Sequence, residues 1–396
     1  MKFIQTITLL LFVACCGRAG TFSTLFDFSA DPIGQGPFSQ LVQGPNGTLY
    51  GETFNGEGNS WGTVFAINPN GTGFTNLFSF SYTNGAFPKG GLILSGNTLY
   101  GTTYEGANGY GTVFAVSTNG LNFTNLFSFT NGVDGESPVT SLLLSGNTLY
   151  GTAEGGGLYG YGTIFAINTD STGFTNIYQF TSTNGGNPES SLILSGSTLY
   201  GTGGGGAFGD GSVFAVNTNG SGFTNLVSFE NYNGYAPVSS LILSGNTLYG
   251  TTDGGGTKNF GNVFAINTDS LGFTNLYSFT DGADGADIAT GLILSGNTLY
   301  GTANRGGTNN YGTIFSLTFT PPASPPSQPS LSIHVTGGNL VITWSNTVTG
   351  YALASTTNLG SSASWSLVTN TPVIVNGFYT VTVAITGGQM FYSLSP

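Results

Sequence analysis

Carboxylates are the reactive side chains that this sequence offers in number. The chain has 17 Asp and Glu residues against five Lys and Arg, and its single histidine is His334. N-terminal to His334, therefore, no Ser-His-Asp triad and no zinc site of His and Cys can form. Carboxylates can accept hydrogen bonds from sugar hydroxyls, bind Ca²⁺, or work in pairs in glycoside hydrolysis.

Aromatic rings recur beside many of these acids, just before the third strand of five repeats, with Phe208 of the fourth repeat displaced by two positions. A ring face covers the C–H groups of a sugar while carboxylates accept its hydroxyl protons, so the pattern predicts a carbohydrate-binding surface. The alternative is that the rings pack between repeats and the acids keep the chain soluble. The candidate ligand-binding residues are Trp61, Glu105, Tyr110, Glu154, Tyr161, Phe208, Asp253, Phe260 and Tyr311.

Two acidic, glycine-rich stretches are candidates for calcium, the only cofactor that the sequence suggests. They are Asp281-Gly-Ala-Asp284-Gly-Ala-Asp287 and the shorter Asp134-Gly-Glu136. Calcium favours carboxylates and loop carbonyls, but the spacing is not that of an EF-hand. Acidic glycine-rich loops that simply remain solvated are the alternative.

Few functions that need positive charge remain open to this chain. Beyond the first 20 residues the basic side chains are Lys89, Lys258 and Arg305. Proteins that hold phosphates do so with Lys and Arg, so this composition argues against nucleic acid as a partner. The glycine runs are not phosphate loops, because no lysine follows them at the required spacing.

The elements that position these residues are repeats. The phrase SGNTLYGT and its variants place a tyrosine at Tyr50, Tyr100, Tyr150, Tyr200, Tyr249 and Tyr300, a period of about 50 residues. One repeat divides into four short apolar segments, 141–144, 148–152, 163–168 and 174–180, separated by Gly, Asn and Thr. Such segments are typical of strands joined by turns, and four strands repeated at this period predict a six-bladed β-propeller over 21–319.

The two ends of the repeat region complement each other. Residues 22–28, FSTLFDF, match the fourth segment of a repeat, and the last repeat lacks that segment. We therefore expect the ring to close by pairing of the N- and C-terminal strands. In a blade, the loop between strands two and three and the loop to the next blade emerge on one side, so most acids are expected on one face.

The repeats resemble the secreted bacterial GloVer family, whose name refers to Gloeobacter and Verrucomicrobia. The resemblance rests on LYGT, the glycine-rich loop after it, the segment GTVFA at 111–115 and the segment FTNLFSF at 123–129, which recur in this order. It implies a repeat architecture on an exported protein and brings no catalytic motif. The period is also distantly similar to a kelch blade, without its usual tryptophan.

The two termini are expected to differ from the repeats. Residues 1–20 have a lysine, an apolar run and small residues, the layout of a secretory signal peptide; a lipid anchor on Cys15 is the lesser alternative. The proline-rich stretch 320–330 predicts a linker, and 331–396 predicts a small β-sandwich of fibronectin or immunoglobulin type with Trp344 and Trp365 in its core. We expect no transmembrane segment and a secreted or cell-surface location.

These observations leave three functions. The first is an exported, non-catalytic repeat protein that binds a polysaccharide or cell-surface glycan on its acidic, aromatic face. The second is a carboxylate-dependent glycoside hydrolase or lyase, although no pair of acids stands out in the sequence. The third is a structural component of the cell envelope.

Overall fold

The computed structural model describes residues 24–28, 34–56, 61–106, 108–130, 132–288, 290–319, 331–345, 351–357, 365–385 and 389–395. The chain divides into two compact units, Met1–Thr318 and Phe319–Pro396. The predicted leader 1–20, including Cys15, and the predicted linker 320–330 lie outside the described residues. Within the described ranges, no helix has the length and apolar character needed to cross a membrane.

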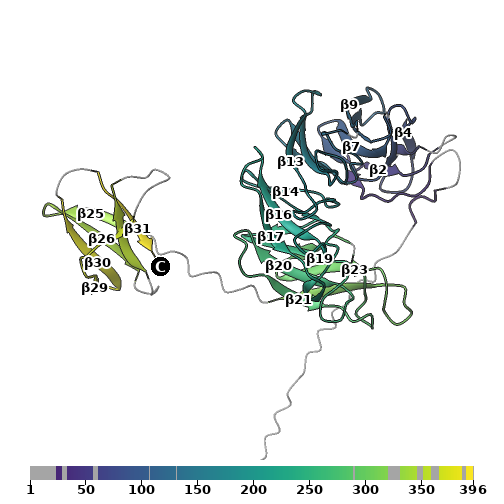
Figure 1. The fold of residues 1–396 in the computed structure, drawn as a ribbon. Helices are drawn as coiled ribbons and strands as arrows, with labels where there is room; N and C mark the ends of the chain where they lie inside the picture. Colours follow the sequence, from purple (N-terminus) through teal and green to yellow (C-terminus); the bar gives the residue numbers. More distant parts are fainter. Residues whose placement is uncertain are drawn as a thin grey trace, which may run out of the picture. The chain divides into compact units, whose positions relative to one another are not determined.

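The N-terminal unit consists of six consecutive antiparallel sheets, coloured from purple to green in Figure 1. The first three sheets contain β1 (Val42–Gln43), β2 (Leu49–Thr53), β3 (Thr63–Ile67) and β4 (Thr75–Ser79); β5 (Ala86–Pro88), β6 (Ile93–Ser95), β7 (Thr98–Glu105), β8 (Thr112–Ser117) and β9 (Thr124–Ser128); and β10 (Leu143–Ser145), β11 (Thr148–Ala153), β12 (Thr163–Asn168) and β13 (Thr175–Gln179). The last three contain β14 (Ile193–Ser195), β15 (Thr198–Gly203), β16 (Ser212–Asn217) and β17 (Thr224–Ser228); β18 (Ile242–Ser244), β19 (Thr247–Thr252), β20 (Asn262–Asn267) and β21 (Thr274–Ser278); and β22 (Ile293–Ser295), β23 (Thr298–Ala303) and β24 (Thr313–Thr318).

These strands confirm the four segments predicted for each repeat. In the third sheet β10, β11, β12 and β13 pair in chain order, each antiparallel to the next. The turn between β10 and β11 is the Ser-Gly-Asn of the repeated phrase, where Gly146 has φ 60°. A two-residue hairpin turn of this kind needs a left-handed backbone, which glycine adopts without steric cost.

The glycine of LYGT makes room for a phenylalanine in the neighbouring strand. Gly201 in β15 pairs with Phe214 in β16, and a Cβ atom on Gly201 would lie 2.7 Å from Phe214 Cζ and 3.0 Å from Leu192 Cδ2. Phe214 is completely buried. The same close approach recurs at Gly51, Gly101, Gly151, Gly250 and Gly301. The repeated glycine is thus a packing requirement of each sheet.

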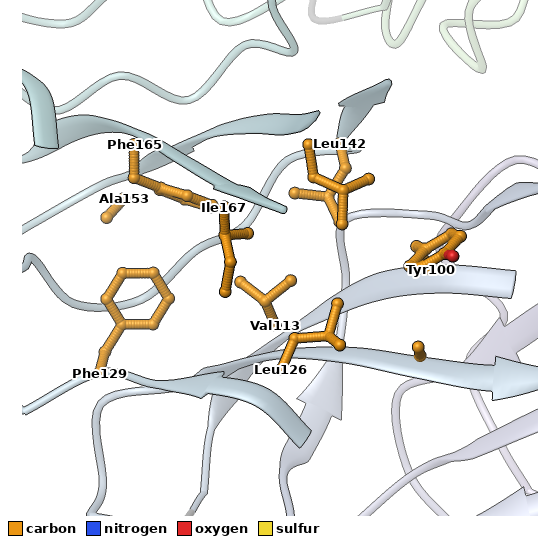
Figure 2. Close-up of a cluster of buried hydrophobic side chains, with 10 residues drawn as sticks. Tyr100, Val113, Leu126, Phe129, Leu142, Ala153, Phe165 and Ile167 are labelled. Atoms are coloured by element: carbon orange, nitrogen blue, oxygen red, sulfur yellow. The ribbon is translucent and has the colours of Figure 1, made fainter. Parts of the chain in front are cut away.

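Each sheet buries its faces against its neighbours in the chain. Figure 2 shows Val113, Leu126 and Phe129 of the second sheet converging on Phe165 and Ile167 of the third. The second sheet covers Phe165 and Ile167 of β12 and the fourth sheet covers Ile164 and Ala166, so the first five residues of this strand are all buried. That explains why the sequence of these strands is apolar without alternation.

Stacked rings join the outer strands of successive sheets. Phe78 stacks on Phe123 with ring centroids 3.8 Å apart, and Phe127 stacks on Phe174 at 3.5 Å. Tyr178 continues the pattern with Phe223 at 4.0 Å. These nearly parallel rings bury apolar surface between the outer strands of successive sheets.

The sixth sheet has three described strands, and the outer edge of β24 is unpaired among the described residues. Residues 24–28 form no strand, but Phe26 stacks on Phe74 at 4.1 Å and Phe28 contacts Phe65 at 5.3 Å. The predicted pairing of this segment with the last repeat is therefore not present among the described pairings. Closure into a six-bladed ring stays a prediction.

The C-terminal unit is a small sandwich of two antiparallel sheets. One contains β25 (Ser332–Thr336), β26 (Asn339–Ser345), β29 (Val373–Val375) and β30 (Phe378–Ala384); the other contains β27 (Ala352–Thr356), β28 (Ser366–Leu367) and β31 (Phe391–Ser395). Their shared core includes Trp344 and Ile342 from the first sheet and Leu353 and Leu394 from the second. The prediction that Trp365 is a core residue is wrong, because 42% of it is exposed just before β28.

The role of the repeated glycine gives a testable prediction. Gly201→Ala should lower the free energy of unfolding by about 1–3 kcal/mol, because the new methyl group must displace Phe214 or Leu192 in a closely packed interior. Chemical denaturation monitored by circular dichroism would measure the change. Gly204→Ala is the matched control, since the nearest atom to a Cβ there is 3.7 Å away and the residue is exposed. Equal stability of both variants would contradict the packing role.

Candidate functional site

The loops between sheets and the glycine-rich loops lie side by side. Single backbone bridges join Gln35 to Asn55, Glu136 to Gly155, Tyr235 to Gly254 and Ala286 to Arg305. In each pair, the first residue belongs to the loop entering a sheet and the second follows the LYGT strand of that sheet. The two loop types therefore share one end of the sheets, as predicted, and we call this end the loop face.

Each loop entering a sheet is tied to the preceding repeat by a strained residue. Phe87, Ser137, Asn187, Ala236 and Asp287 all have φ between 49° and 58°, although none is glycine. This left-handed conformation turns each N–H toward the preceding repeat: Phe87 donates to the carbonyl of Trp61 at 2.9 Å, and Asn187 donates to that of Tyr161 at 2.8 Å. The hydrogen bonds offset a conformational cost of about 1–2 kcal/mol per residue.

The predicted ligand-binding rings differ in how far they are exposed. Trp61 is half-buried against Tyr82 and Phe87, and Tyr110 packs against the core between the second and third sheets. Tyr161 is 39% exposed and Tyr311 is 91% exposed.

The fourth repeat has no ring at the position equivalent to Tyr161, whereas the fifth repeat has Phe260 there. Phe208 is 60% exposed. Asp210 takes the position of the ring and accepts the backbone hydrogen bond from Ala236. Phe260 is partly exposed and bridges to Gly255.

A continuous run of rings lies at the first two sheets instead. Phe38 contacts Phe54 with centroids 5.5 Å apart, Phe54 stacks on Phe87 at 4.9 Å, and Phe87 contacts Trp61 at 5.5 Å. Tyr82 extends the run on the far side of Trp61 at 4.9 Å. We call these five residues the aromatic run. Phe38 is 72% exposed, so the run opens to solvent at one end.

Sequence reasoning identified Trp61 alone from this run. The signal for Phe54 is its position directly after the LYGT strand, where the second repeat has Tyr104 and the third has Glu154. This position faces the loop that enters the same sheet, as the bridge from Asn55 to Gln35 shows. Rings from loops of both types therefore meet in space, although no regular spacing in the sequence relates them.

Beside the aromatic run is a group of charged side chains. Burial raises the pKa of Glu154, repulsion from Glu189 and Glu136 raises it further, and attraction to Lys89 opposes the change. Lys89 follows the aromatic run by two residues, and its ammonium lies 5.6 Å from the centre of the Tyr104 ring. We call Glu136, Glu154, Glu189 and Lys89 the charged group. The sequence pattern predicted Glu154 as a ligand-binding residue and Glu136 as a calcium ligand. Glu105, another predicted ligand-binding acid, lies outside this group at the end of β7, opposite Ala86.

A second charged group lies at the fifth and sixth repeats. Burial raises the pKa of Asp253, repulsion from Asp287 adds to this, and Arg305 opposes it. Arg305 forms an ion pair with Asp287, donating from Nη2 to Oδ1 at 3.0 Å. More than half of the Arg305 side chain is exposed, at 53%, so this pair contributes little to stability.

Two of the predicted calcium ligands, Asp134 and Asp284, accept hydrogen bonds from their own loops. Asp134 accepts hydrogen bonds from the N–H of Thr130 at 2.9 Å and of Gly132 at 3.2 Å. Asp284 makes the same two bonds to Thr280 and Gly282 and also accepts from the Tyr277 hydroxyl at 3.0 Å. Over the described ranges, no three His, Cys, Asp or Glu side chains are grouped so that they could hold a metal ion. A calcium site at these loops and at Asp281 stays a prediction.

The most unusual titratable group was not singled out in the sequence. Glu52 occupies the fourth position of LYGT in the first repeat, where Thr102, Thr152, Thr202, Thr251 and Thr302 stand in the others. It is 2% exposed, Oε2 accepts from the Gly91 N–H at 3.1 Å, and Oε1 has no partner among the described residues. Burial raises the pKa of Glu52 to about 8, against the opposing effects of Gly91 and Ser39.

Its surroundings explain how a glutamate fits there. In the second repeat, Thr102 donates to the carbonyl of Thr140 in the third sheet, a hydroxyl link between sheets. Glu52 makes the corresponding link to the second sheet as an acceptor from Gly91. A Cβ atom on Gly101 of the second repeat would lie 2.9 Å from Glu52 Oε1, so the glycine of LYGT leaves space for the longer side chain. Glu52 therefore serves the contact between the first two sheets.

With the fold and these groups described, the sequence can be compared with known families. The profile of the Gloeobacter/Verrucomicrobia repeat matches residues 15–204 and 202–324, most of the chain. The chain belongs to the Gloeobacter/Verrucomicrobia repeat family. No curated protein matches the sequence. The family assignment confirms the resemblance seen in LYGT and its neighbouring segments, while the fibronectin-type interpretation of the C-terminal unit stays a prediction.

Solved structures resemble the Gloeobacter/Verrucomicrobia repeat chain in fold. A GH74 enzyme from Niastella koreensis is 15% identical with a TM-score of 0.51, covering 90% of this chain and 64% of its own. An oligogalacturonate lyase in complex with manganese is 12% identical with a TM-score of 0.47, covering 78% and 86%. A protein assigned as TolB from Agrobacterium tumefaciens is 11% identical with a TM-score of 0.40, covering 71% and 90%. The repeat region is accordingly an all-β, propeller-like fold.

The raised pKa of Glu52 predicts a stability that depends on pH. Between the ordinary value of 4.5 and about 8 the folded state keeps a proton that the unfolded state loses, so stability should fall as pH rises through this window. Replacing the carboxyl by an amide in Glu52→Gln removes this contribution. The melting temperature of the variant, measured by calorimetry from pH 5 to 9, should therefore fall less with pH than that of the parent.

Two further variants sharpen this test. Glu52→Thr restores the residue of the other repeats and should also flatten the profile. Glu105→Gln removes a partly exposed carboxylate and should leave the profile unchanged. If the melting temperature of Glu52→Gln depends on pH as steeply as that of the parent and differs only by a constant offset, Glu52 is ionised in the folded protein.

A calcium site in the Asp281–Asp287 loop predicts a metal-dependent melting temperature. Ligand binding to the folded state stabilises it by mass action, so millimolar calcium should raise the melting temperature of a chelator-treated sample by a few degrees. Asp281→Asn should abolish the increase, and Asp170→Asn, in the turn before β13, should not. Equal melting temperatures with calcium and with chelator would rule out the calcium site.

Proposed function

We propose that this protein is an exported, non-catalytic repeat protein that binds carbohydrate on its loop face. The observation that supports this most is the aromatic run, which ends in the exposed ring of Phe38, next to the charged group around Glu154. Rings offer flat apolar surface to the C–H faces of sugars, and adjacent carboxylates and an ammonium offer hydrogen bonds to hydroxyls. The binding residues in this proposal are Phe38, Phe54 and Lys89 with Glu154 and Glu189.

A second function is favoured by one observation within the same group. Glu154 has a raised pKa and is repelled by Glu189, and a carboxyl with a raised pKa near a second carboxyl is what the acid in glycoside hydrolysis requires. In this alternative Glu154 protonates the leaving oxygen and Glu189 acts as base or nucleophile. A structural envelope component that binds no glycan is the third possibility.

Export is part of the same proposal. It is supported by the signal-like composition of residues 1–20 and by the absence of cysteine after Cys16. A secreted or surface location would bring the loop face into contact with extracellular polysaccharide. Mass spectrometry of the N-terminus of the protein from the medium or envelope would distinguish cleavage near Ala19 from a lipid-modified Cys15.

Retention on immobilised polysaccharides tests the binding function. The full chain should be retarded in affinity gels by at least one polysaccharide of a broad panel. Phe38→Ala and Phe54→Ala should reduce the apparent affinity about tenfold or more, because each removes ring surface from the proposed site. Leu121→Ala, an exposed residue in the turn between β8 and β9 at the opposite end of the sheet, is the control.

Turnover is assayed in the same panel. Release of reducing ends that disappears in Glu154→Gln and persists in Leu121→Ala would establish the hydrolase or lyase instead. Retention that is unchanged in Phe38→Ala and Phe54→Ala would overturn the aromatic run as the binding surface. A panel with neither retention nor turnover would favour the structural role.

A further inference from the structure

The C-terminal unit leaves a large ring uncovered beside its three-stranded sheet. Trp365 is 42% exposed directly before β28, although tryptophan is highly buried on average in folded proteins. Trp344 in the other sheet is 1% exposed, so this small sandwich is able to bury an indole. Leu367, two residues after Trp365, is 65% exposed. Exposed apolar side chains are therefore grouped at β28.

Strand alternation shows which way these side chains point. Leu353 and Leu394 belong to the core that the two sheets share, and Val368 packs against this core. Successive side chains of a strand lie on opposite faces of its sheet. The neighbours of these core residues therefore lie on the outer face of the sheet, which carries Ala354, Thr356, Trp365, Leu367, Phe391 and Ser393.

One row across this outer face has an aromatic ring on each side. Thr356 of β27 pairs with Phe391 of β31. On the other side Ser355 pairs with Ser366 of β28, and this register places Trp365 opposite Thr356. Neighbouring strands are about 4.8 Å apart, so the two rings come from strands about 10 Å apart. Thr356 between them is 7% exposed and lies low in the row.

The next row has the same arrangement with smaller side chains. Ala354 pairs with Leu367 on one side and with Ser393 on the other. Ala354 is 3% exposed, so a low residue again lies between two larger ones. The Ser393 hydroxyl donates to the Leu394 carbonyl at 3.5 Å, which is long for a hydrogen bond. This hydroxyl is able to exchange its contact for a ligand hydroxyl beside the rings.

No formal charge takes part in this surface. Residues 331–396 contain no Asp, Glu, Lys or Arg, and His334 belongs to β25 in the other sheet. Ligands with phosphate or carboxylate groups are held in proteins by Lys and Arg, which are absent here. Ring faces and hydroxyls remain, and these suit the C–H faces and hydroxyls of an uncharged sugar chain.

We propose that the outer face of the sheet formed by β27, β28 and β31 is a second glycan-binding site, in which Trp365 and Phe391 stack on sugar rings of a neutral, extended polysaccharide. The spacing of the two strands, about 10 Å, is about the length of two sugar units of such a chain, so the rings contact alternate sugars. Ser393 bonds a sugar hydroxyl beside them.

A second copy of the chain is a poorer occupant of this face. Its longest strands, β27 and β31, have five residues each, so the face measures about 10 Å between the outer strands and about 16 Å along them. A stable protein interface buries about 800 Å² on each partner, which is several times this area. A sugar chain needs only the two ring faces and the strip between them.

This site does not depend on the loop face, because all of its residues belong to the C-terminal unit. Binding here should be nearly independent of salt, since no charged side chain is involved. The two sites can be separated by variants. Phe38→Ala with Phe54→Ala removes rings of the loop face, and Trp365→Ala removes the indole of the second site.

Retention of the full chain in affinity gels tests the second site. The polymers are hydroxyethylcellulose, glucomannan and a soluble β-1,3-glucan, and the background is Phe38→Ala with Phe54→Ala. At least one polymer should retard this chain to the same extent in low and in high salt. Trp365→Ala should weaken the apparent affinity about tenfold or more, while Trp365→Phe keeps a ring and most of the affinity. Val375→Ala, 48% exposed in the other sheet, is the control.

Fluorescence provides a readout that a merely structural effect would not move. An exposed indole emits at longer wavelength than a buried one, so stacking of a sugar on Trp365 should shift the emission to shorter wavelength. Trp365→Phe should abolish this shift, and Trp61→Phe should preserve it. Equal melting temperatures of Trp365→Phe and the parent would show that the fold is retained.

Each outcome decides for or against the second site. Retention that is lost in Trp365→Ala but kept in Val375→Ala supports it, and if Phe38→Ala and Phe54→Ala have no effect, the loop-face site alone is overturned. No retention by any of the three neutral polymers, or retention unchanged in Trp365→Ala, overturns the second site whatever the loop face binds. A dimer in sedimentation that Trp365→Ala dissociates would show that a second copy covers the face, and would also overturn it.

Discussion

The contact between successive sheets is the interaction on which the rest of the N-terminal unit depends. A sheet of four short strands has little apolar surface of its own, and both of its faces must be covered. Phe129 and Val113 on one sheet and Phe165 and Ile167 on the next bury each other almost completely. Since the chain has no cysteine after residue 16, packing and not disulfide bonds stabilises these sheets.

The constraint explains which residues recur and which vary. The glycine of LYGT recurs because a phenylalanine from the neighbouring strand fills the space above it, as Phe214 does at Gly201. The threonine that follows recurs because its hydroxyl links one sheet to the next, as Thr102 does with Thr140. Glu52 is the exception, and it links the first two sheets by accepting a hydrogen bond from the Gly91 N–H instead. The loops are not subject to this requirement, so rings and charges differ there from repeat to repeat.

Because the loops vary from repeat to repeat, the rings and charges on the loop face are unlike those of a regular pattern. Phe38, Phe54 and Phe87 come from loops of two repeats and meet because a bridge aligns the two loop types at each sheet. Glu154, Glu136 and Glu189 come from three different loops, and burial together with their mutual repulsion raises the pKa of Glu154. A surface with rings at one side and carboxyls at the other results from differences between repeats, and not from the repeated phrase.

The amino-acid sequence by itself determined the period, the four strands of each repeat and the common side of the two loop types. The physical reason is that these features depend on local spacing: short apolar segments form strands, and glycine and asparagine form the turns between them. The two sheets of the C-terminal unit and the burial of Trp344 also followed from alternation, whereas the exposure of Trp365 did not.

Only the tertiary structure decided which side chains meet. Trp61 and Tyr311 have equivalent positions in the sequence, yet one is packed between Tyr82 and Phe87 and the other is 91% exposed, because their neighbours differ. Phe38 and Phe54 had no periodic signal, and their contact depends on a backbone bridge between two loops. Burial of Glu52 likewise depends on Gly91 and Gly101 of the next repeat. Contacts between repeats are set by the fit of unlike residues at long range, which a repeated pattern along the chain does not encode.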